Sequence, residues 1–184
     1  MNELIDKAIK FACCAHQNQF RKGSNIPYIS HPFAVALILQ KTGASDEQII
    51  AGILHDVVED TQASLEDIKF EFGDKIAQLV EACSECDPKA PWENRKQNTL
   101  DSLKTASAEV KLIVCADELH NLKCIAHDFM TIGDEVWKKF GRGKEAQAWY
   151  YTKLVETLCM GLNKHDNTSI FHQLKDEVHK LFRT

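Results

Sequence analysis

The sequence predicts an all-α fold of about eight to ten helices, formed by a single domain over residues 1–184. Apolar residues recur every three or four positions along most of the chain, which is the period of an amphipathic helix. The polar–apolar alternation of a strand is nowhere sustained, and no internal repeat is visible. With 184 residues, of which 44% are hydrophobic, the chain is long enough to bury one core.

The first two predicted helices flank a loop. The first helix is indicated by an apolar stripe of Leu4, Ala8, Phe11 and Ala15. Residues 17–30, which are interrupted by a glycine and a proline, are predicted as a loop. The second helix begins near His31, because the proline that follows suits a first helical turn, and it ends at Gly43.

Capping residues mark the next helices. Ser45 and the glutamine three residues later form a capping box, which predicts a third helix that continues to Asp60. Ser64 is the expected start of another helix, and Gly73 separates that helix from one over residues 74–86.

The rest of the chain is predicted as helices separated by glycines and by a proline-containing loop at residues 87–91. These helices are expected at 92–105, 107–130, 134–140, 144–164 and 166–183. Residues 144–184 are expected to pack as C-terminal helices on the rest of the domain.

Composition and charge exclude several classes of protein. The formal net charge is −5, from 22 basic and 27 acidic side chains, whereas a protein that binds nucleic acid through its phosphates normally carries a basic surface. The sequence contains neither a long uncharged apolar run nor a signal-peptide pattern, and its seven cysteines favour reduced thiols. We therefore expect a cytoplasmic protein without a nucleic-acid or membrane partner, and the oligomeric state stays open.

A histidine and three carboxylates share one face of the predicted third helix. With His55 at 0° and about 100° per residue, Glu59 falls at about 40°, Asp56 at about 100° and Asp60 at about 140°. A solvent-exposed acidic face explains this pattern equally well. However, carboxylates near a helix C-terminus oppose the helix dipole at about 0.3–1 kcal/mol each, which favours a cation nearby.

Asp117 lies within a mostly apolar stripe of a predicted helix. A carboxylate is almost never buried without a partner, so three interpretations remain open. The stripe faces solvent, Asp117 pairs with an arginine or lysine, or it binds a divalent ion together with His31, His55 and Asp56. Two imidazoles and two carboxylates suit Mn²⁺, Fe²⁺ or Zn²⁺.

The order of these residues resembles the H…HD…D motif of the HD-domain metal-dependent phosphohydrolases. Further stretches resemble the hydrolase domain of the RelA/SpoT-type alarmone enzymes, and the stand-alone small alarmone hydrolases in particular. These stretches are Ala15-His16-Gln17, Arg21-Lys22-Gly23, Pro27-Tyr28-Ile29-Ser30-His31-Pro32, Leu54-His55-Asp56-Val57-Val58-Glu59-Asp60-Thr61, Ala116-Asp117-Glu118-Leu119-His120-Asn121-Leu122 and Trp149-Tyr150-Tyr151.

The resemblance implies a single HD phosphohydrolase domain that removes the 3′-pyrophosphate of the alarmone (p)ppGpp in a metal-dependent reaction. The products are GDP or GTP and pyrophosphate. Glu59 and Asp60 are implied to orient and deprotonate the attacking water. The implied ligands of one ion, Mn²⁺ or another divalent metal, are His31, His55, Asp56 and Asp117.

The partner that the resemblance implies is a small-molecule nucleotide. Arg21 and Lys22 are implied to flank its guanine or phosphates, Tyr28 to shape the same wall, Asn121 to face the nucleoside, and Lys96 to lie near the distal phosphates. The cations and Asn121 also have plain alternatives, which are solvated charge for the cations and an interior amide for Asn121.

One residue departs from the family pattern. Glu118 stands where the family commonly has a basic residue, so it either alters a contact with a substrate phosphate or faces solvent. Alternative functions are an HD phosphohydrolase for another nucleotide, a nucleotide sensor without turnover, and a helical adaptor.

Overall fold

The computed structural model describes residues 2–85, 89–162 and 169–182, and it confirms the all-α prediction. Within these ranges no β-strand occurs, and an isolated bridge joins Phe20 to Pro27. In chain order the helices are α1 (Glu3–Ala15), α2 (Ser30–Lys41), α3 (Asp46–Leu54), α4 (Val57–Asp60), α5 (Leu65–Phe72), α6 (Asp74–Cys83), α7 (Trp92–Thr105), α8 (Ala108–Ile132), the 3₁₀ helix η1 (Gly133–Lys139), α9 (Gly143–Leu158) and α10 (Ser169–Phe182).

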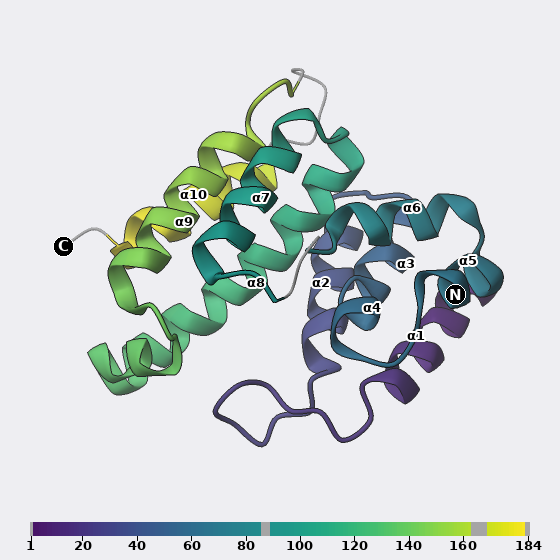
Figure 1. Cartoon of the computed structure of the whole chain (residues 1–184), viewed down its shortest axis with the longest axis horizontal. Coiled ribbons are helices and arrows are strands. Elements are labelled where there is room, and N and C mark those ends of the chain that lie inside the picture. Colours follow the sequence, from purple (N-terminus) through teal and green to yellow (C-terminus); the bar gives the residue numbers. More distant parts are fainter. Residues whose placement is uncertain (1, 86–88, 163–168, 183–184) are drawn as a thin grey trace.

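Helix α8 lies at the centre and joins two groups of helices (Figure 1). On one side it packs against α2, α3 and α6, and on the other against α10 and η1. Outside this layer, α1 packs on α3, α5 on α6, and α7 and α10 on α9. Among the described helices, none is both long enough and apolar enough to cross a membrane.

Both predicted capping boxes are present. The Ser45 hydroxyl accepts the Gln48 amide at 3.3 Å, while the Gln48 side chain accepts the Ser45 amide at 2.7 Å. Ser64 and Asp67 make the same reciprocal pair at the start of α5. Gly73 separates α5 from α6 at a φ of 88°, a backbone conformation that favours glycine.

The prediction of one continuous third helix through Asp60 is wrong. The structure divides it into α3 and α4, with His55 and Asp56 in a turn between them. Asp56 has φ −91° and ψ −7°, in the sparsely populated bridge region where many active-site residues lie. Because the backbone turns there, the angles of a straight helix do not describe how Asp56, Glu59 and Asp60 are arranged around His55.

Several predicted boundaries fall partly outside the described residues. This applies to the loop at 87–91 and to the helices at 74–86, 144–164 and 166–183. Helix α6 ends at Cys83 because Ser84 is extended, with ψ 147°. The predicted helix at 134–140 is the 3₁₀ helix η1, and α9 ends at Leu158.

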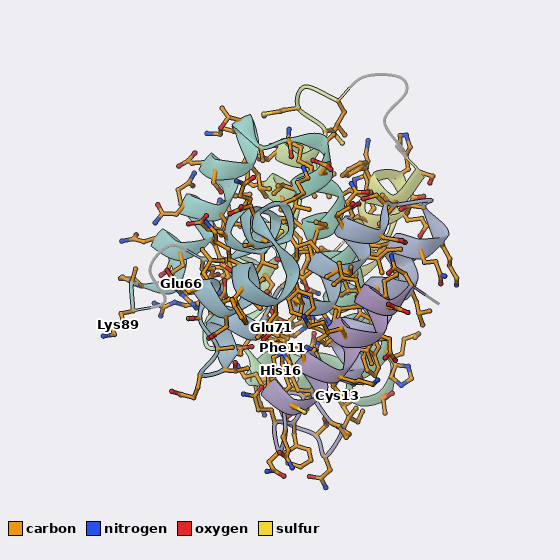
Figure 2. The ribbon with its side chains drawn as sticks, turned by 90° about the vertical axis from the view of Figure 1, so that its right-hand side faces the viewer. Phe11, Cys13, His16, Glu66, Glu71 and Lys89 are labelled. Carbon is orange, nitrogen blue, oxygen red and sulfur yellow. The ribbon has the colours of Figure 1, made fainter. Side chains whose placement is uncertain are left out.

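Two close contacts position the N-terminal helices. On α1, the ring of Phe11 packs edge-on against Phe72 of α5, with centroids 5.5 Å apart. Cys13, two positions farther along α1, is exposed (both residues are labelled in Figure 2). Helix α3 lies against α2 at Gly52, where an added Cβ would overlap Leu39 Cδ1 and come within 3.4 Å of Val35 Cγ1. Glycine therefore sets how closely the helix that carries His55 approaches the helix that carries His31.

Candidate metal centre and active site

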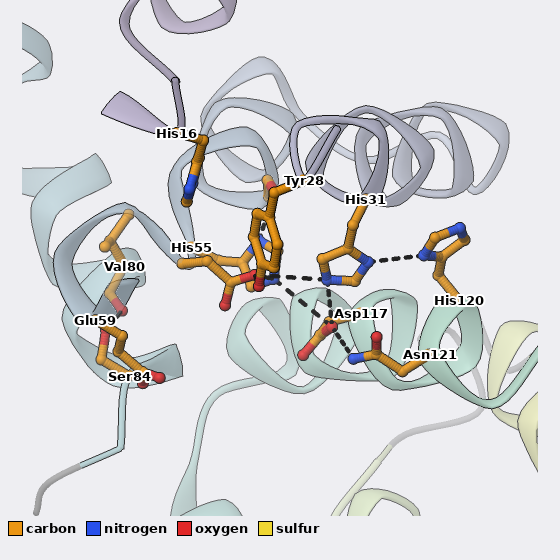
Figure 3. A network of polar contacts seen from close by, with 12 residues as sticks. His16, Tyr28, His31, His55, Glu59, Val80, Ser84, Asp117, His120 and Asn121 are labelled. Carbon is orange, nitrogen blue, oxygen red and sulfur yellow. Dashed lines mark hydrogen bonds and ion pairs between the residues drawn. The ribbon is translucent and has the colours of Figure 1, made fainter. Parts of the chain in front are cut away.

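Three segments bring the predicted ligands together. His31 lies in the first turn of α2, His55 and Asp56 form the turn between α3 and α4, and Asp117 lies in the middle of α8. The side chains of His31, His55 and Asp117 point toward one another (Figure 3). Both imidazoles are buried, whereas the side chain of Asp117 is 22% exposed, so the group is reached by solvent at Asp117.

Distances within this group suit a single divalent ion. One ligand atom from each of His31, His55 and Asp117 lies within 4.8 Å of the other two. His31 Nε2 is 3.0 Å from Asp117 Oδ1, and His55 Nε2 is 3.0 Å from Asp56 Oδ2. The crossed distances are 3.5 Å from His31 Nε2 to Asp56 Oδ2 and 3.6 Å from His55 Nε2 to Asp117 Oδ1.

The hydrogen bonding of the His55 imidazole suits coordination of a metal through Nε2. Its Nδ1 lies 2.8 Å from the Gly52 carbonyl oxygen and donates to it, which leaves the Nε2 lone pair free to face the carboxylates. Among the described residues, His55 Nε2 has no hydrogen-bond partner, since its approach to Asp56 lacks hydrogen-bond geometry. A buried nitrogen lone pair beside two carboxylates is the donor set that a borderline divalent cation prefers.

Electrostatics point to the same requirement for a positive charge. Burial alone lowers the pKa of His55, but the carboxylates of Asp56 and Asp117 raise it well above its ordinary value. For Asp117, burial opposes ionisation, while His55 and His31 lower its pKa well below its usual range. In the absence of a metal, therefore, the two carboxylates favour a proton on the His55 imidazole, at the position that a cation would neutralise.

Both carboxylates also accept hydrogen bonds from neighbouring side chains. Tyr28 Oη donates to Asp56 Oδ2 at 2.6 Å, and Asn121 Nδ2 donates to Asp117 Oδ1 at 2.7 Å. These donors orient the carboxylates without adding charge. Tyr28 and Asn121 were predicted as substrate contacts, and the structure places both beside the predicted metal ligands.

The predicted catalytic pair lies on α4, beyond the turn. Glu59 accepts a hydrogen bond from the backbone amide of Glu85, while partial burial and the nearby carboxylate of Asp56 raise its pKa to about 7. Burial and Asp56 also raise the pKa of Asp60. The backbone carbonyl of Asp60 accepts a hydrogen bond from Gln19 Nε2 at 2.6 Å, which ties α4 to the loop after α1. Both groups thus have pKa values shifted toward those of useful proton acceptors.

The two predicted cations of the loop between α1 and α2, Arg21 and Lys22, make contacts in different directions. Arg21 Nη2 donates to Asn121 Oδ1 at 2.7 Å, and its guanidinium lies 5.5 Å from the centre of the Tyr28 ring. Arg21, Tyr28 and Asn121 therefore form one wall beside Asp117. The ammonium of Lys22 instead lies 5.7 Å from the ring of Phe140, at the end of η1.

Lys96 reaches the site from α7 and is already paired. Its Nζ donates to Glu85 Oε1 at 3.0 Å and lies 4.8 Å from the centre of the Tyr150 ring, while Arg95 Nη1 donates to Glu85 Oε2 at 2.6 Å. Burial lowers the pKa of Lys96, but Glu118 and Glu85 raise it more strongly.

The interpretation of Glu118 as a solvent-facing residue is wrong. It is buried, and its Oε1 accepts a hydrogen bond from Tyr150 Oη at 2.6 Å. Burial and the adjacent Asp117 raise its pKa, while Lys96 opposes this rise. A straight helical projection did not reveal this contact because Tyr150 comes from α9, 32 positions away in the chain.

Two further histidines border the centre. His120 Nδ1 lies 2.7 Å from His31 Nδ1, and burial together with His31 lowers the pKa of His120 to about 4. His16 Nδ1 lies 2.8 Å from Gln19 Oε1, and His16 Nε2 has no hydrogen-bond partner among the described residues. The sequence signal for His120 was its helical spacing of three residues from Asp117.

Comparison with known proteins identifies similar domains. The family described as "HD domain" matches residues 8–143. A GTP pyrophosphokinase of Streptomyces coelicolor is 36% identical over 126 residues, which cover 67% of this chain and 15% of that protein. The guanosine-3′,5′-bis(diphosphate) 3′-pyrophosphohydrolase MESH1 of Xenopus tropicalis is 37% identical over 123 residues, which cover 65% of this chain and 68% of that protein. The matched region thus spans less than two thirds of the long curated relatives, whose covered share is 15–18%.

Two solved structures share the fold. The Listeria monocytogenes protein lmo0812 superposes with a TM-score of 0.79 at 35% identity, covering 84% of this chain and 99% of that chain. A metazoan ortholog of SpoT, described as hydrolyzing ppGpp and playing a role in starvation responses, superposes with a TM-score of 0.80 at 25% identity, covering 98% of this chain and 96% of that chain.

Proposed function

This chain belongs to the HD domain family, and on that premise we propose that it removes the 3′-pyrophosphate of (p)ppGpp, which yields GDP or GTP and pyrophosphate. The observation that carries the proposal is the group of His31, His55 and Asp117 with Asp60 on the adjoining α4. The activity named for MESH1 and for the SpoT ortholog supports the choice of substrate.

In this proposal a single divalent ion, Mn²⁺ or a metal of similar preference, is held by two imidazoles and two carboxylates. A bound ion of this kind polarises a phosphoryl oxygen and makes its water a better nucleophile. The contacts from Gly52 to His55 and from Asn121 to Asp117 hold two of the ligands in orientation. The proposed ligands are His31, His55, Asp56 and Asp117.

Glu59 and Asp60 are the proposed proton acceptors for the attacking water. Both lie on α4, directly after the turn that carries His55 and Asp56. The amide of Glu85 orients Glu59, and Gln19 fixes the backbone of Asp60. A positioned carboxylate that accepts a proton contributes typically about 10²–10⁴-fold in rate.

The nucleotide is proposed to lie against the wall of Arg21, Tyr28 and Asn121, with its phosphates directed toward the metal and Lys96. The cation and the aromatic ring of this wall suit a nucleobase, since a guanidinium and a ring offer flat surfaces for stacking. Lys22 lies farther along the same loop and is proposed to meet a phosphate of the substrate.

Release of pyrophosphate tests the proposal. Purified protein with Mn²⁺ and ppGpp should release pyrophosphate, and Asp60→Asn should lower kcat by about 10²–10⁴-fold, because it removes the proton acceptor at constant size. Asp101→Asn, the same change on the exposed face of α7, is the control and should retain full activity. Absence of pyrophosphate release by the wild-type protein with Mn²⁺, Co²⁺ and Zn²⁺ would exclude this substrate.

A second candidate is hydrolysis of another nucleotide, and buried Glu118 favours it. A carboxylate at this position reduces the positive potential that a highly charged substrate meets beside Asp117. Ranking guanine and adenine nucleotides by kcat/KM would distinguish the two substrates. Tight ppGpp binding without turnover would instead support a nucleotide sensor.

The proposed location is the cytoplasm. The cysteines assigned in the structure, which are Cys13, Cys14, Cys83, Cys115, Cys124 and Cys159, are all free thiols, as expected in a reducing compartment. Fractionation of the cells that produce the protein tests this location.

A further inference from the structure

His120 contacts His31 on the edge of the ring that faces away from the carboxylates. The two Nδ1 atoms are 2.7 Å apart, and the rings stack with centroids 4.9 Å apart and planes 28° from parallel. His31 is buried, at 1% exposure, so water does not compete for its Nδ1. Figure 3 shows the His120 ring beside His31, on the side opposite Tyr28.

The direction of this hydrogen bond follows from the chemistry of the two rings. When His31 Nε2 donates its lone pair to a cation, the neutral ring carries its proton on Nδ1. That N–H then donates to His120 Nδ1, which must be unprotonated to accept it. The remaining proton of His120 lies on Nε2, which faces Cys124 Sγ at 3.7 Å.

The two imidazoles of the centre are therefore supported by different acceptors. His55 donates to the carbonyl of Gly52, which has a fixed role as an acceptor, whereas His31 donates to a side chain. A ligating histidine almost always donates its second ring N–H to a carboxylate, a carbonyl or water, and these partners fix the ring orientation. In this chain an imidazole takes that place for His31.

We propose that His120 is a positioning residue that accepts the Nδ1–H of His31 and so directs His31 Nε2 at the divalent cation. The proposal rests on the metal site of the proposed function, but it does not depend on the identity of the nucleotide. Loss of His120 leaves the buried Nδ1–H of His31 without an acceptor, so the ring loses the contact that holds its Nε2 between Asp56 and Asp117.

The test is the affinity of the full chain for Mn²⁺, measured by calorimetry without nucleotide. His120→Ala should weaken Mn²⁺ binding by about 10–100-fold, the usual effect of removing the acceptor behind a histidine ligand. His120→Asn should restore most of the affinity, because its side-chain oxygen can accept the same N–H. His127→Ala, an exposed histidine farther along α8, is the control and should bind like the wild type.

A spectroscopic measurement separates this role from a general packing role. In the Zn²⁺-loaded wild type, ¹⁵N-resolved NMR of the histidine rings should show His31 with its proton on Nδ1. Unchanged Mn²⁺ affinity in a folded His120→Ala variant would overturn the proposal, and so would a His31 proton on Nε2. If the wild type binds Mn²⁺ but does not hydrolyse ppGpp, the substrate is wrong and the role of His120 stands.

Discussion

Gly52→Ala is expected to destabilise the protein, although it improves the intrinsic propensity of a helix. In an unhindered helix interior, replacing glycine by alanine stabilises by roughly 0.5–1 kcal/mol. Here the new methyl group would overlap Leu39 Cδ1, and Leu39 is fully buried, so its side chain has no route to solvent. The sign of the change in free energy of unfolding therefore distinguishes packing from propensity.

The expected magnitude is the difference between these two effects. Overpacking a close-packed core by a methyl group costs typically about 1–3 kcal/mol. After the propensity gain is subtracted, we expect a net loss of up to about 2.5 kcal/mol in the free energy of unfolding. For a chain of this size, that corresponds to a melting temperature lower by up to roughly 10 °C. Because α3 must move away from α2, the Gly52 carbonyl also shifts, and the affinity for Mn²⁺ should fall through His55.

Urea unfolding followed by circular dichroism, in the presence of EDTA, measures this change. Gly141→Ala is the control, since a Cβ there meets nothing within 4 Å and the backbone does not require glycine. In a Leu39→Ala background the cost of Gly52→Ala should shrink by about 0.5–3 kcal/mol, the usual coupling between residues in contact. A Gly52→Ala protein that is more stable than the wild type would refute the reasoning.

Three further outcomes are expected. Lys96→Met should lower the free energy of unfolding in urea by about 1–3 kcal/mol, because it removes the cation that pairs with Glu85 and whose charge opposes the raised pKa of buried Glu118, and adding Glu118→Gln should recover part of the loss. Glu85→Gln should tighten the binding of inorganic pyrophosphate in calorimetry, because it releases Arg95 and Lys96, whereas Glu93→Gln, on the helix that carries those two cations, should not. Removing bound metal with EDTA should lower the melting temperature, by the equivalent of about 2.7 kcal/mol from a metal concentration 100 times Kd, and an unchanged melting temperature would contradict the metal site.

The sequence predicted those features that depend on local pattern. Both capping boxes lie where their residues indicated, because a cap is formed within one turn of helix. The order of His31, His55 and Asp117 also predicted that they meet. The turn at Asp56 was missed, since the apolar period on either side of it is that of a helix and the break lies in the backbone conformation of one residue.

The features that sequence reasoning missed depend on contacts between distant segments. Buried Glu118 accepts a hydrogen bond from Tyr150, 32 positions away in the chain, and the charge of Lys96, 22 positions away, opposes the rise that burial causes in its pKa. His120 has a partner on α2, 89 positions away. Helical spacing shows which residues share a face of α8, but it does not show which helix covers that face.

The unbroken course of α8 separates the parts of the proposed site that can vary from those that cannot. Within two turns this helix presents the proposed metal ligand Asp117, the neighbour of the proposed ligand His31, and Asn121 of the proposed nucleotide wall, so a residue inserted among them would rotate those that follow by about 100° and disrupt their arrangement. The loop before α2 carries Arg21 and Tyr28 and is bound by no such periodicity. The loop can therefore change in sequence or length, by evolution or by design, and alter nucleotide preference. Helix α8 must keep its length and register, because it sets the relative positions of the residues of the site.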